Sequence, residues 1–393
     1  MKDVLVIGAG PVGLSLALRL ARAGADVTVL EAEDHLSNDA RASTIHPPTL
    51  EFWRDLGVAD RVVSAGIRVD RLQYWERCSR ELLAEFDYGL IARDTAYPFR
   101  LQCPQATVIP LLAEALEAAG GRLLFGHRLI GLNQDADGVN ATIMGPDGPH
   151  QRRCTWLAGC DGASSVVRQT LEIPFPGKTY EDRFLLTSTD LALDTVYPGI
   201  GPVAYIFDPQ EWVIVMQVPG ATRVVFRLHP DEDAIAAQEP TALRARLDRF
   251  TGDHLSYAIH SSRIYRVHQR VADQFRHGRI VLAGDAAHIN NPAGGMGMNS
   301  GVHDARDLGQ AFIDMFENGD ASALDRYATN RRAVAAEGVQ AHTDQHYGEL
   351  STSKEQQRMD RNQAYRAAAQ DPHIARRWVL QRAMLDGRAG GVA

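Results

Sequence analysis

The first thirty residues have a hydrophobic pattern that predicts a βαβ unit. Residues 4–7 form a continuous apolar run, which is typical of a parallel strand covered on both faces. From residue 12 to residue 22 the apolar positions recur at helical spacing, and Gly24 follows as a stop signal. A second strand is predicted over residues 26–30. The unit has the length of about 30 residues expected of this motif.

The rest of the chain divides into regions of different texture. We expect a hairpin over 72–76 and 82–88, a helix over 106–119 and a strand over 122–125. An antiparallel excursion is expected at 130–133 and 139–144, a buried strand at 280–283 and a helix at 304–316. Between about 179 and 265, short β-rich runs separated by turn residues predict a mainly antiparallel second lobe, with strands at 184–189, 203–207, 212–218 and 223–228.

The turn inside the βαβ unit reads Gly8-Ala9-Gly10-Pro11-Val12-Gly13. Gly8 allows a sharp turn, Gly10 lets the backbone approach a pyrophosphate, and Gly13 lets helix and strand pack closely. The helix N-terminus would present free N–H groups to the phosphates. Glu31, at the end of the second strand, is placed to accept a ribose hydroxyl. The turn alone could be a plain glycine turn. The whole unit indicates dinucleotide binding without separating NAD from FAD.

Two further glycine motifs follow strands. One is Gly159-Cys160-Asp161-Gly162, with Arg168 seven residues after the aspartate. The other runs from Gly284-Asp285 through Pro292 to Asn299, and is rich in glycine. Asp285 could bind a ribityl hydroxyl, and the glycines would let N–H groups approach the anionic edge of a reduced flavin. A capped glycine loop would explain one such motif, but not three in this order.

With these motifs, nearly the whole chain resembles the flavoprotein aromatic hydroxylases. Arg41 matches the family arginine that contacts FAD, Gln105 the glutamine on the ribityl side, and Asn299 the asparagine that ends the flavin-facing loop. The chain departs from the larger phenol hydroxylases because it has no C-terminal thioredoxin-like domain. It has a helical tail instead, which in smaller relatives packs on the flavin lobe.

The resemblance implies an α/β fold: a Rossmann-like FAD-binding lobe, an inserted antiparallel β-sheet substrate lobe and a short helical tail. We expect the FAD lobe at 1–71, 100–178 and 266–345, the substrate lobe at 72–99 and 179–265, and the tail at 346–393.

The activity that the resemblance implies is aromatic hydroxylation. NAD(P)H would reduce FAD, a flavin C4a-hydroperoxide would form with O₂, and oxygen would pass to a phenol-like ring. The implied catalytic residues are Pro292, Gly295 and Met296. The implied cofactor-binding residues are Gly8, Gly10, Pro11, Val12, Gly13, Glu31, Arg41, Gln105, Asp161, Arg168, Gly284, Asp285, Gly295, Gly297, Met298 and Asn299.

The substrate residues are less determined. Tyr205, Gln217 and Arg227 are candidates for orienting a polar substrate, although for any one of them sheet packing or a surface position is the more common role, and His46 is similarly ambiguous. Two further residue sets have open roles. His288 could be a base but more often such a residue supports its loop, and Asn290-Asn291 could face the substrate or cap a helix.

Composition narrows the partners. The net charge of −8 argues against nucleic-acid binding. The four cysteines show no metal-ligand spacing, so we expect no metal and interpret them as small buried residues in a reducing compartment. With no leader or apolar span in the sequence, we expect a cytoplasmic monomer or homodimer.

The acidic segment after Glu31, Ala32-Glu33-Asp34-His35, favours NADH slightly over NADPH because it offers no arginine to a 2′-phosphate.

Two alternatives remain. One is another oxidoreductase on the same FAD lobe, a halogenase or a reductase, although the halogenase W-x-W-x-I-P segment is not found. The other is a non-catalytic flavin-binding redox sensor, which would usually bring an output module.

Overall fold

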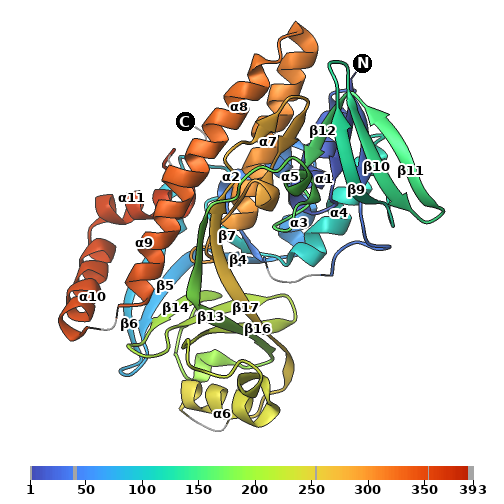
Figure 1. The fold of residues 1–393 in the computed structure, drawn as a ribbon. Helices are drawn as coiled ribbons and strands as arrows, with labels where there is room; N and C mark the ends of the chain where they lie inside the picture. The colour runs from blue at the N-terminus through green and yellow to red at the C-terminus, as the bar shows by residue number, and fades with distance from the viewer. Residues whose placement is uncertain (1, 39–41, 253–254, 353, 388–393) are drawn as a thin grey trace.

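The computed structural model describes residues 2–38, 42–252, 255–352 and 354–387. Figure 1 shows two lobes, with a column of C-terminal helices running along them. The first lobe is built on a six-stranded sheet of β18 (Arg276–His277), β19 (Ile280–Leu282), β12 (Trp156–Gly159), β1 (Asp3–Ile7), β2 (Asp26–Leu30) and β8 (Arg122–Leu124), in that order. All of its pairs are parallel except β18 with β19.

Both faces of this sheet are covered, as the apolar run of its first strand predicts. Val4 and Val6 face the helical layer, while Leu5 and Ile7 face a small antiparallel sheet. The helical layer includes α1 (Pro11–Arg22), α4 (Gln105–Ala118), α7 (Gly297–Asn318) and α8 (Ser322–Ala333). The small sheet consists of β9 (Arg128–Gln134), β10 (Val139–Gly145) and β11 (Gly148–Cys154). The strand β11 is missing from the sequence-based prediction.

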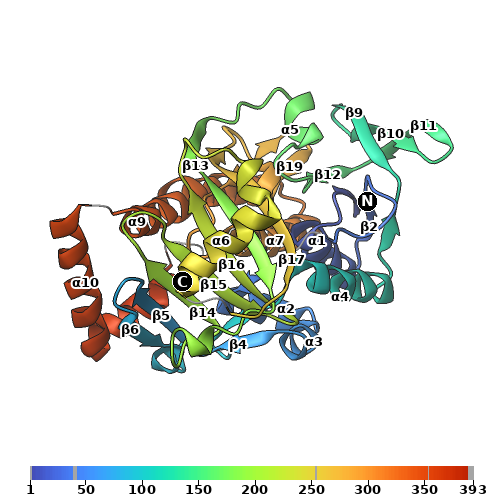
Figure 2. The same cartoon turned by 90° about the horizontal axis from the view of Figure 1, so that it is seen from below.

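Short elements join this lobe to the second one. A three-stranded sheet has the order β3 (Thr44–Ile45), β7 (Arg100–Gln102) and β4 (Ile67–Val69). The helices α2 (Pro47–Asp55) and α3 (Ala59–Ser64) lie beside it, and α5 (Val166–Thr170) follows β12. Figure 2 shows the second lobe from below, with α6 (Pro240–Thr251) lying over its sheet.

The second lobe is one eight-stranded sheet, mainly antiparallel as predicted. Its order is β20 (His288–Ile289), β17 (Ile259–Val271), β13 (Gly177–Thr189), β16 (Ala221–Leu228), β15 (Val213–Val218), β14 (Val203–Phe207), β5 (Arg71–Glu76) and β6 (Glu81–Asp87). The single parallel pair is β14 with β5. One face packs under α6 (Pro240–Thr251), a helix that the sequence pattern did not predict.

The opposite face of this sheet carries aromatic residues that pack against the C-terminal helices. These are α9 (Gln340–Leu350), α10 (Glu355–Gln370) and α11 (Pro372–Arg382). Phe86 stacks on Trp378 at 3.8 Å between ring centroids, and Tyr74 lies 4.5 Å from Tyr365. The expectation that the tail packs on the flavin lobe is therefore wrong for α10 and α11, because these apolar rings of β5 and β6 provide their packing partners.

The expected burial of the cysteines holds for three of the four. Cys103, Cys154 and Cys160 are buried, but Cys78 is exposed, so the interpretation of all four as buried is wrong for Cys78. Burial raises the pKa of Cys103 to about 11 and that of Cys154 to about 12. Across the described residues, no helix combines the length and the apolar character that a membrane crossing requires.

Candidate active site and cofactor cradle

The three glycine motifs meet at one edge of the parallel sheet. Ile7 is paired with Gly159 across β1 and β12, and Gly159 is paired with Leu282 across β12 and β19. The motifs follow the carboxyl ends of these adjacent strands, where ligands bind in open parallel sheets. Leu30, at the end of β2, is paired with Ile7, which brings Glu31 to the same edge.

The glycines of the first turn have different surroundings. A Cβ on Gly13 would lie 2.1 Å from the Gly8 carbonyl oxygen, so the helix could not pack there with a side chain. Gly8 has φ +101°, and a Cβ on it would lie 2.5 Å from the Cys160 carbonyl oxygen. By contrast, nothing lies within 4 Å of a Cβ placed on Gly10. The turn is therefore closed on the protein side and open at Gly10, the position expected to approach the pyrophosphate.

The N-terminus of α1 is free to receive an anion. Gly10 is its N-cap and provides no side-chain acceptor, and Pro11 occupies the first turn. The backbone N–H groups of the first helical turn can therefore donate to a bound anion, and the positive end of the helix dipole faces the same place. Val12 packs behind the turn, because a Cβ on Gly284 or on Gly301 would lie within 3 Å of its side chain.

Glu31 is held in place at the edge of the cradle. Its carboxylate accepts hydrogen bonds from the Ala9 N–H at 2.9 Å and from the Glu33 N–H at 3.1 Å. Arg128, on β9, forms an ion pair with Glu33 at 2.9 Å. The acidic segment 32–35 contains no arginine, but the fold brings Arg128 beside it from the neighbouring sheet.

Asp161 and Arg168 have distinct roles in the second motif. One carboxylate oxygen of Asp161 accepts from the Val167 N–H at 3.1 Å, while its Oδ1 is buried with no partner among the described residues. Burial raises the pKa of Asp161. Arg168 donates to the carbonyls of Ala163 and Ala286, at 2.7 and 2.8 Å. Arg168 thus fastens the second motif to the third.

A buried ion network supports the third motif. Asp304, on α7, accepts from the Gly284 N–H at 2.9 Å, from His288 Nε2 at 2.7 Å and from Arg331 Nε at 2.6 Å. Burial opposes ionisation of Asp304, but His288 and Arg331 outweigh it and lower the pKa of the carboxyl. His288 is buried in this network, which confirms its supporting role. Asp285, next to Gly284, is exposed at the edge of the sheet.

The loop from Pro292 to Gly295 is held by Asn299. Asn299 Oδ1 accepts from the His46 N–H, and its amide donates to the carbonyls of Thr44 and Gly295, each at 2.8 Å. Gly294 and Gly295 have φ of +89° and +67°, a region that favours glycine. Asn299 is fully engaged with protein atoms, so what it contributes to the site is the position of this loop.

The loop itself differs from two expectations. The side chain of Met296 is fully buried against Val339 and Met384, so Met296 can face a ligand only with its backbone. Asn291 does not cap α7, which begins at Gly297. It accepts from the Ala293 N–H at 3.0 Å and donates to the Tyr180 hydroxyl at 3.0 Å. Helix capping is therefore the wrong interpretation for Asn291. Gly297 and Met298 begin α7 and are half-buried, and Pro292 is exposed.

The substrate candidates from the sequence do not form one group. Tyr205 is buried and stacks on Tyr74 at 5.2 Å, on the face that carries the tail. Arg227 is on the same face but is paired with Asp182, at 2.8 Å from Nε. Gln217 is on the same strand face as Val213 and Val215, which pack on the opposite side of the sheet under α6. Of the three, Tyr205 alone lies on the tail-facing side without a carboxylate partner.

His46 lies at the loop. Its Nε2 is 3.0 Å from the Gly294 carbonyl oxygen, and burial, together with the charge of Arg100, lowers its pKa well below the usual value. Two cofactor candidates remain. Gln105 begins α4 and is half-buried, with its N–H donating to Ala42. Arg41 lies outside the described residues.

The sequence-based analysis missed four buried residues near this loop: Arg100, His342, His346 and Arg382. His346 Nε2 is 3.3 Å from the Tyr74 hydroxyl, and Arg100 donates to the Arg382 carbonyl at 2.8 Å. The i, i+4 spacing of His342 and His346 is the one feature of the sequence that would place them on the same face of a helix. No group of His, Cys, Asp and Glu with metal-binding geometry occurs in the described ranges.

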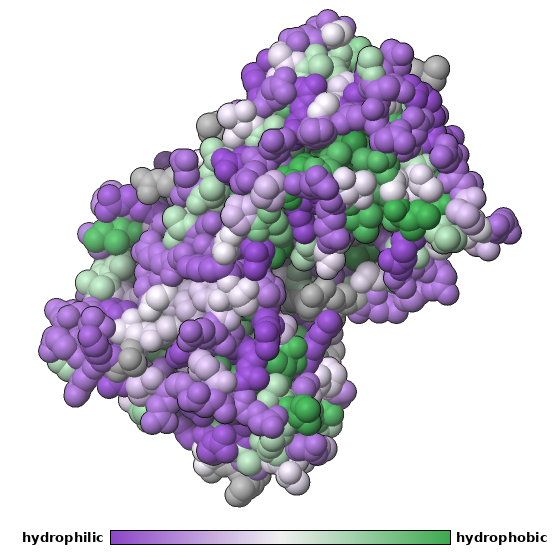
Figure 3. Space-filling model, viewed as in Figure 1, coloured by the Kyte–Doolittle hydropathy of each residue, from purple (hydrophilic) through white to green (hydrophobic). Residues whose placement is uncertain are grey.

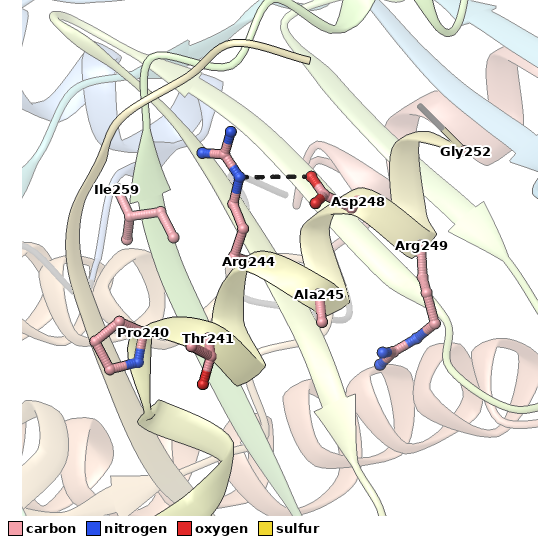
Figure 4. Close-up of a pocket in the computed structure, with 8 residues that line it drawn as sticks. All are labelled: Pro240, Thr241, Arg244, Ala245, Asp248, Arg249, Gly252 and Ile259. Atoms are coloured by element: carbon pink, nitrogen blue, oxygen red, sulfur yellow. Dashed lines mark ion pairs between the residues drawn. The ribbon is translucent and has the colours of Figure 1, made fainter. Parts of the chain in front are cut away.

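A surface groove lies elsewhere. It has a volume of about 980 Å³ and lies on α6 of the second lobe (Figure 4). The ion pair drawn there joins Arg244 and Asp248 at 3.7 Å. Its lining comes from α6 and the start of β17, with no residue of the three glycine motifs: Pro240, Thr241, Arg244, Ala245, Asp248, Arg249, Gly252 and Ile259. Figure 3 shows a mainly hydrophilic face, with apolar patches of which the largest lie on the first lobe.

The fold and the cradle define a two-lobed dinucleotide-binding protein, and comparisons with known proteins make the class specific. The FAD binding domain family matches residues 1–342. Para-nitrophenol 4-monooxygenase of Pseudomonas sp. strain WBC-3 is 34% identical over 404 residues, covering 99% of this chain and 97% of the relative. Pentachlorophenol 4-monooxygenase of Sphingobium chlorophenolicum is 31% identical over 345 residues, covering 84% and 62%.

Solved structures agree with these relatives. A p-nitrophenol 4-monooxygenase from Pseudomonas putida superposes with a TM-score of 0.91 at 31% identity, covering 100% of this chain and 98% of that one. Aklavinone-11 hydroxylase, solved with FAD and aklavinone, gives a TM-score of 0.81 at 29% identity, covering 91% and 70%. The chain therefore belongs to the FAD-dependent aromatic monooxygenases.

Proposed function

We propose that this protein uses NAD(P)H and O₂ to hydroxylate a phenol-like substrate at the edge of its parallel sheet. The observation that carries the proposal is the convergence of three glycine motifs and Glu31 on adjacent carboxyl strand ends, in a chain similar over its full length to a nitrophenol monooxygenase. When bound, FAD would supply the oxygen chemistry, through the C4a-hydroperoxide that the family resemblance implies.

The residues present fit FAD. Gly10 leaves open space at the N-terminus of α1, which supports pyrophosphate binding there. Glu31, already ordered by two backbone N–H groups, would accept a hydrogen bond from a ribose hydroxyl, and the exposed Asp285 would contact the ribityl chain. The buried, unpartnered Asp161 Oδ1 is a further acceptor facing the same edge.

The remaining residues would position the reaction. We infer that Pro292, Gly295 and the Met296 backbone border the flavin ring, and that Gly297, Met298 and the start of α7 face its anionic edge. Asn299 and His46 would hold this loop in register with β3. The aromatic face around Tyr205 and Tyr74 would exclude water from the reacting ring.

The proposal is tested by following NADH and NADPH oxidation in air with the FAD-loaded protein. The panel contains phenols, nitrophenols, hydroxybenzoates, hydroxypyridines and polycyclic phenols, and peroxide is measured in the same samples. We expect at least one phenol to accelerate oxidation with little peroxide and with a hydroxylated product. A compound that accelerates NAD(P)H oxidation but yields only peroxide would be a substrate mimic, which triggers reduction of the flavin without being hydroxylated. A product that forms only with halide would contradict hydroxylation and favour a halogenase. If no compound of a widened panel accelerated NAD(P)H oxidation, the result would favour a reductase or a redox sensor.

The coenzyme preference is a separate prediction. Because Arg128 is paired with Glu33, it is not available to a 2′-phosphate, and the acidic segment would repel one. We expect kcat/KM to be higher for NADH than for NADPH, by about 1.4- to fivefold, which corresponds to the roughly 0.2–1 kcal/mol of an exposed charge interaction. Glu33→Gln should narrow this ratio by releasing Arg128, and Glu117→Gln on the distant α4 should not. A strong preference for NADPH in the unaltered protein would contradict the prediction.

A further inference from the structure

Five buried basic residues converge beside the loop that carries Gly294. They come from four places in the chain: His46 precedes α2, Arg100 is on β7, His342 and His346 are on α9, and Arg382 ends α11. Each is at most 8% exposed. They are joined by the hydrogen bond from Arg100 to the Arg382 carbonyl at 2.8 Å and by the contact of His46 with the Gly294 carbonyl at 3.0 Å. We call this set the basic cluster.

The charges of the basic cluster do not balance. Arg382 is paired with Glu349 at 3.0 Å, and Glu349 also accepts from the Tyr365 hydroxyl at 2.7 Å. Within the described ranges, Arg100 has no carboxylate at ion-pair distance, although it is only 1% exposed. One positive charge is therefore buried without a counter-charge, which ordinarily costs several kcal/mol.

The histidines do not add to this charge. Burial, with the nearby guanidinium groups of Arg382 and Arg100, lowers the pKa of His342 to about 3. The same causes, in the same order, lower the pKa of His346 well below its usual value. Their neutral rings can each donate one hydrogen bond without carrying charge. Arg100 and Arg382 together with Glu349 therefore give a net charge of about +1.

The basic cluster also contains buried polar atoms that have no hydrogen-bond partner among the described residues. Five polar atoms on its two arginines and on its tail histidines have no partner among the described residues: Arg100 Nε, Arg382 Nε and Nη1, His342 Nε2 and His346 Nδ1. A buried unsatisfied donor costs roughly 1–3 kcal/mol, so several together require an explanation. Guanidinium groups can only donate, so the missing partner must be an acceptor.

Aromatic rings surround the same cluster. Tyr205 lies 4.7 Å from His346, and Tyr74 stacks on Tyr205. The guanidinium of Arg100 lies 5.7 Å from the ring of Tyr88. An acceptor that also carries an aromatic ring would therefore satisfy both the donors and the apolar faces.

We propose that the basic cluster binds a single negatively charged oxygen group on an aromatic ligand, with Arg100 as the main counter-charge and the tail helices α9 and α11 supplying the other donors. The ring would lie against Tyr205, beside His346. The ligand would be the substrate, so this inference rests on the proposed function. The ligand would be an aromatic oxyanion, and its charged group either a phenolate oxygen or a carboxylate on the ring.

Binding to the FAD-loaded protein tests this, without any reductant. The probes are 4-nitrophenolate, benzoate, and the uncharged 4-nitroanisole and methyl benzoate as their matched neutral partners. Equilibrium dialysis or the perturbation of flavin absorbance gives each dissociation constant. In the unaltered protein we expect at least one anion to bind about tenfold or more tightly than its neutral partner, or about 1.4 kcal/mol. The pair that shows the difference distinguishes phenolate from carboxylate.

The variants locate the charge. Arg100→Gln and Arg382→Gln should each weaken the anion by about tenfold and leave the neutral partner within about twofold. Arg382→Lys should retain part of the affinity, because it keeps the charge but loses the fork of donors. The control is Arg376→Gln, on the exposed side of α11, where the arginine is paired with Asp94. It should change neither ligand.

Several outcomes would overturn the proposal. These are equal binding of anion and neutral partner, no binding of either anion at millimolar concentration, or equal losses of both ligands in Arg100→Gln. The first two need no variant, so a misfolded variant does not obscure the result. Anion-selective binding without hydroxylation would leave the basic cluster standing and contradict the proposed function. Hydroxylation without anion-selective binding would support the proposed function and contradict anion binding by the basic cluster.

Discussion

Single glycines in the first turn illustrate how one residue type serves two purposes. Gly13 and Gly8 are required by the protein, because a side chain on either would meet a backbone carbonyl oxygen. Gly10 is not required by the protein, because its surroundings are open and its φ of −74° suits any residue. A glycine that the fold does not need is explained by a ligand that approaches the backbone.

This contrast gives a prediction for paired variants. Gly10→Ala should leave the unfolding free energy of the apoprotein within about 0.5 kcal/mol, but weaken FAD by at least about tenfold. Gly13→Ala should itself destabilise the apoprotein by about 1–3 kcal/mol, because a backbone atom blocks the added methyl group. Urea unfolding and the quenching of FAD fluorescence measure the two effects. Gly348→Ala, an exposed glycine with open surroundings on α9, is the control for both.

Asp304 is a second residue whose role is settled by its partners. Three donors converge on its carboxylate from the third glycine motif, from His288 and from Arg331. Replacing it with asparagine would leave a buried arginine without its main partner. We expect Asp304→Asn to lower the unfolding free energy by about 3–5 kcal/mol at neutral pH. The exposed Asp135, paired with Arg153, is the control, and Asp135→Asn should have a much smaller effect.

The difference in unfolding free energy between the unaltered protein and Asp304→Asn should shrink as the pH falls. The pKa of Asp304 is lower in the folded protein than in the unfolded chain, where it is about 3.9. Its stabilising contribution is therefore fully present above about pH 5 and is lost as the pH falls below the unfolded value toward the folded one. Urea titrations from pH 7 down to pH 3 check this. A gap between the two proteins that widens on acidification would contradict it.

The residue scale also shows what a sequence can reveal about a site. The glycines and Glu31 were predicted because short spacings fix how a turn, a helix and a strand end meet. Arg100 and Arg382 were not, because they are 282 positions apart and meet only through the tail. Arg227 and Gln217 were misjudged for a related reason. Strand alternation gives a face, but neither the ion pair with Asp182 nor the helix that covers that face.

At the scale of elements, strands were predicted better than their packing partners. The alternation of Tyr205 and Phe207 on one face of β14 is confirmed, because both contact Tyr74. The helix α6 was missed because its polar composition hides three buried apolar residues, Leu243, Leu247 and Phe250. The tail was assigned the wrong partner because its own sequence is polar, and its few apolar residues do not identify the rings of β5 and β6 that they contact.

The packing of the tail gives an element-scale prediction. Trp378 stacks on Phe86 and lies edge-on to Tyr74 at 5.5 Å, but it is only half-buried. Trp378→Ala should cost about 2 kcal/mol, below the value for a fully buried aromatic residue. Hydrogen exchange should increase in α10 and α11 and change little in β1 and β2. Ile374→Ala, on the exposed side of the same helix, should leave exchange unchanged. Faster exchange in both variants alike would contradict a specific role of the stack.

At the scale of the whole molecule, the two lobes share continuous strands rather than a linker. The long strands β13 and β17 run from the first lobe into the second, and β20, which precedes the Pro292 loop, pairs with β17 through Arg270 and Ile289. The domain boundaries that the sequence indicated, at 178/179 and 265/266, fall inside these two strands. A ladder of hydrogen bonds across a boundary couples the unfolding of the two sides.

This continuity predicts that FAD stabilises both lobes. At a concentration about 100 times its dissociation constant, a ligand adds about 2.7 kcal/mol to the stability of everything that unfolds with its site. The amides of β15 and β16, which carry none of the glycine motifs, should then exchange up to about 100-fold more slowly with FAD, to the same extent as those of β1 and β12. Hydrogen exchange with mass spectrometry, at graded FAD concentrations, measures this. Amides of exposed turns exchange by local opening and serve as the internal control, since FAD should not slow them. If protection stopped at the end of the cradle, the strands crossing between the lobes would be hinges, and the substrate lobe would unfold on its own.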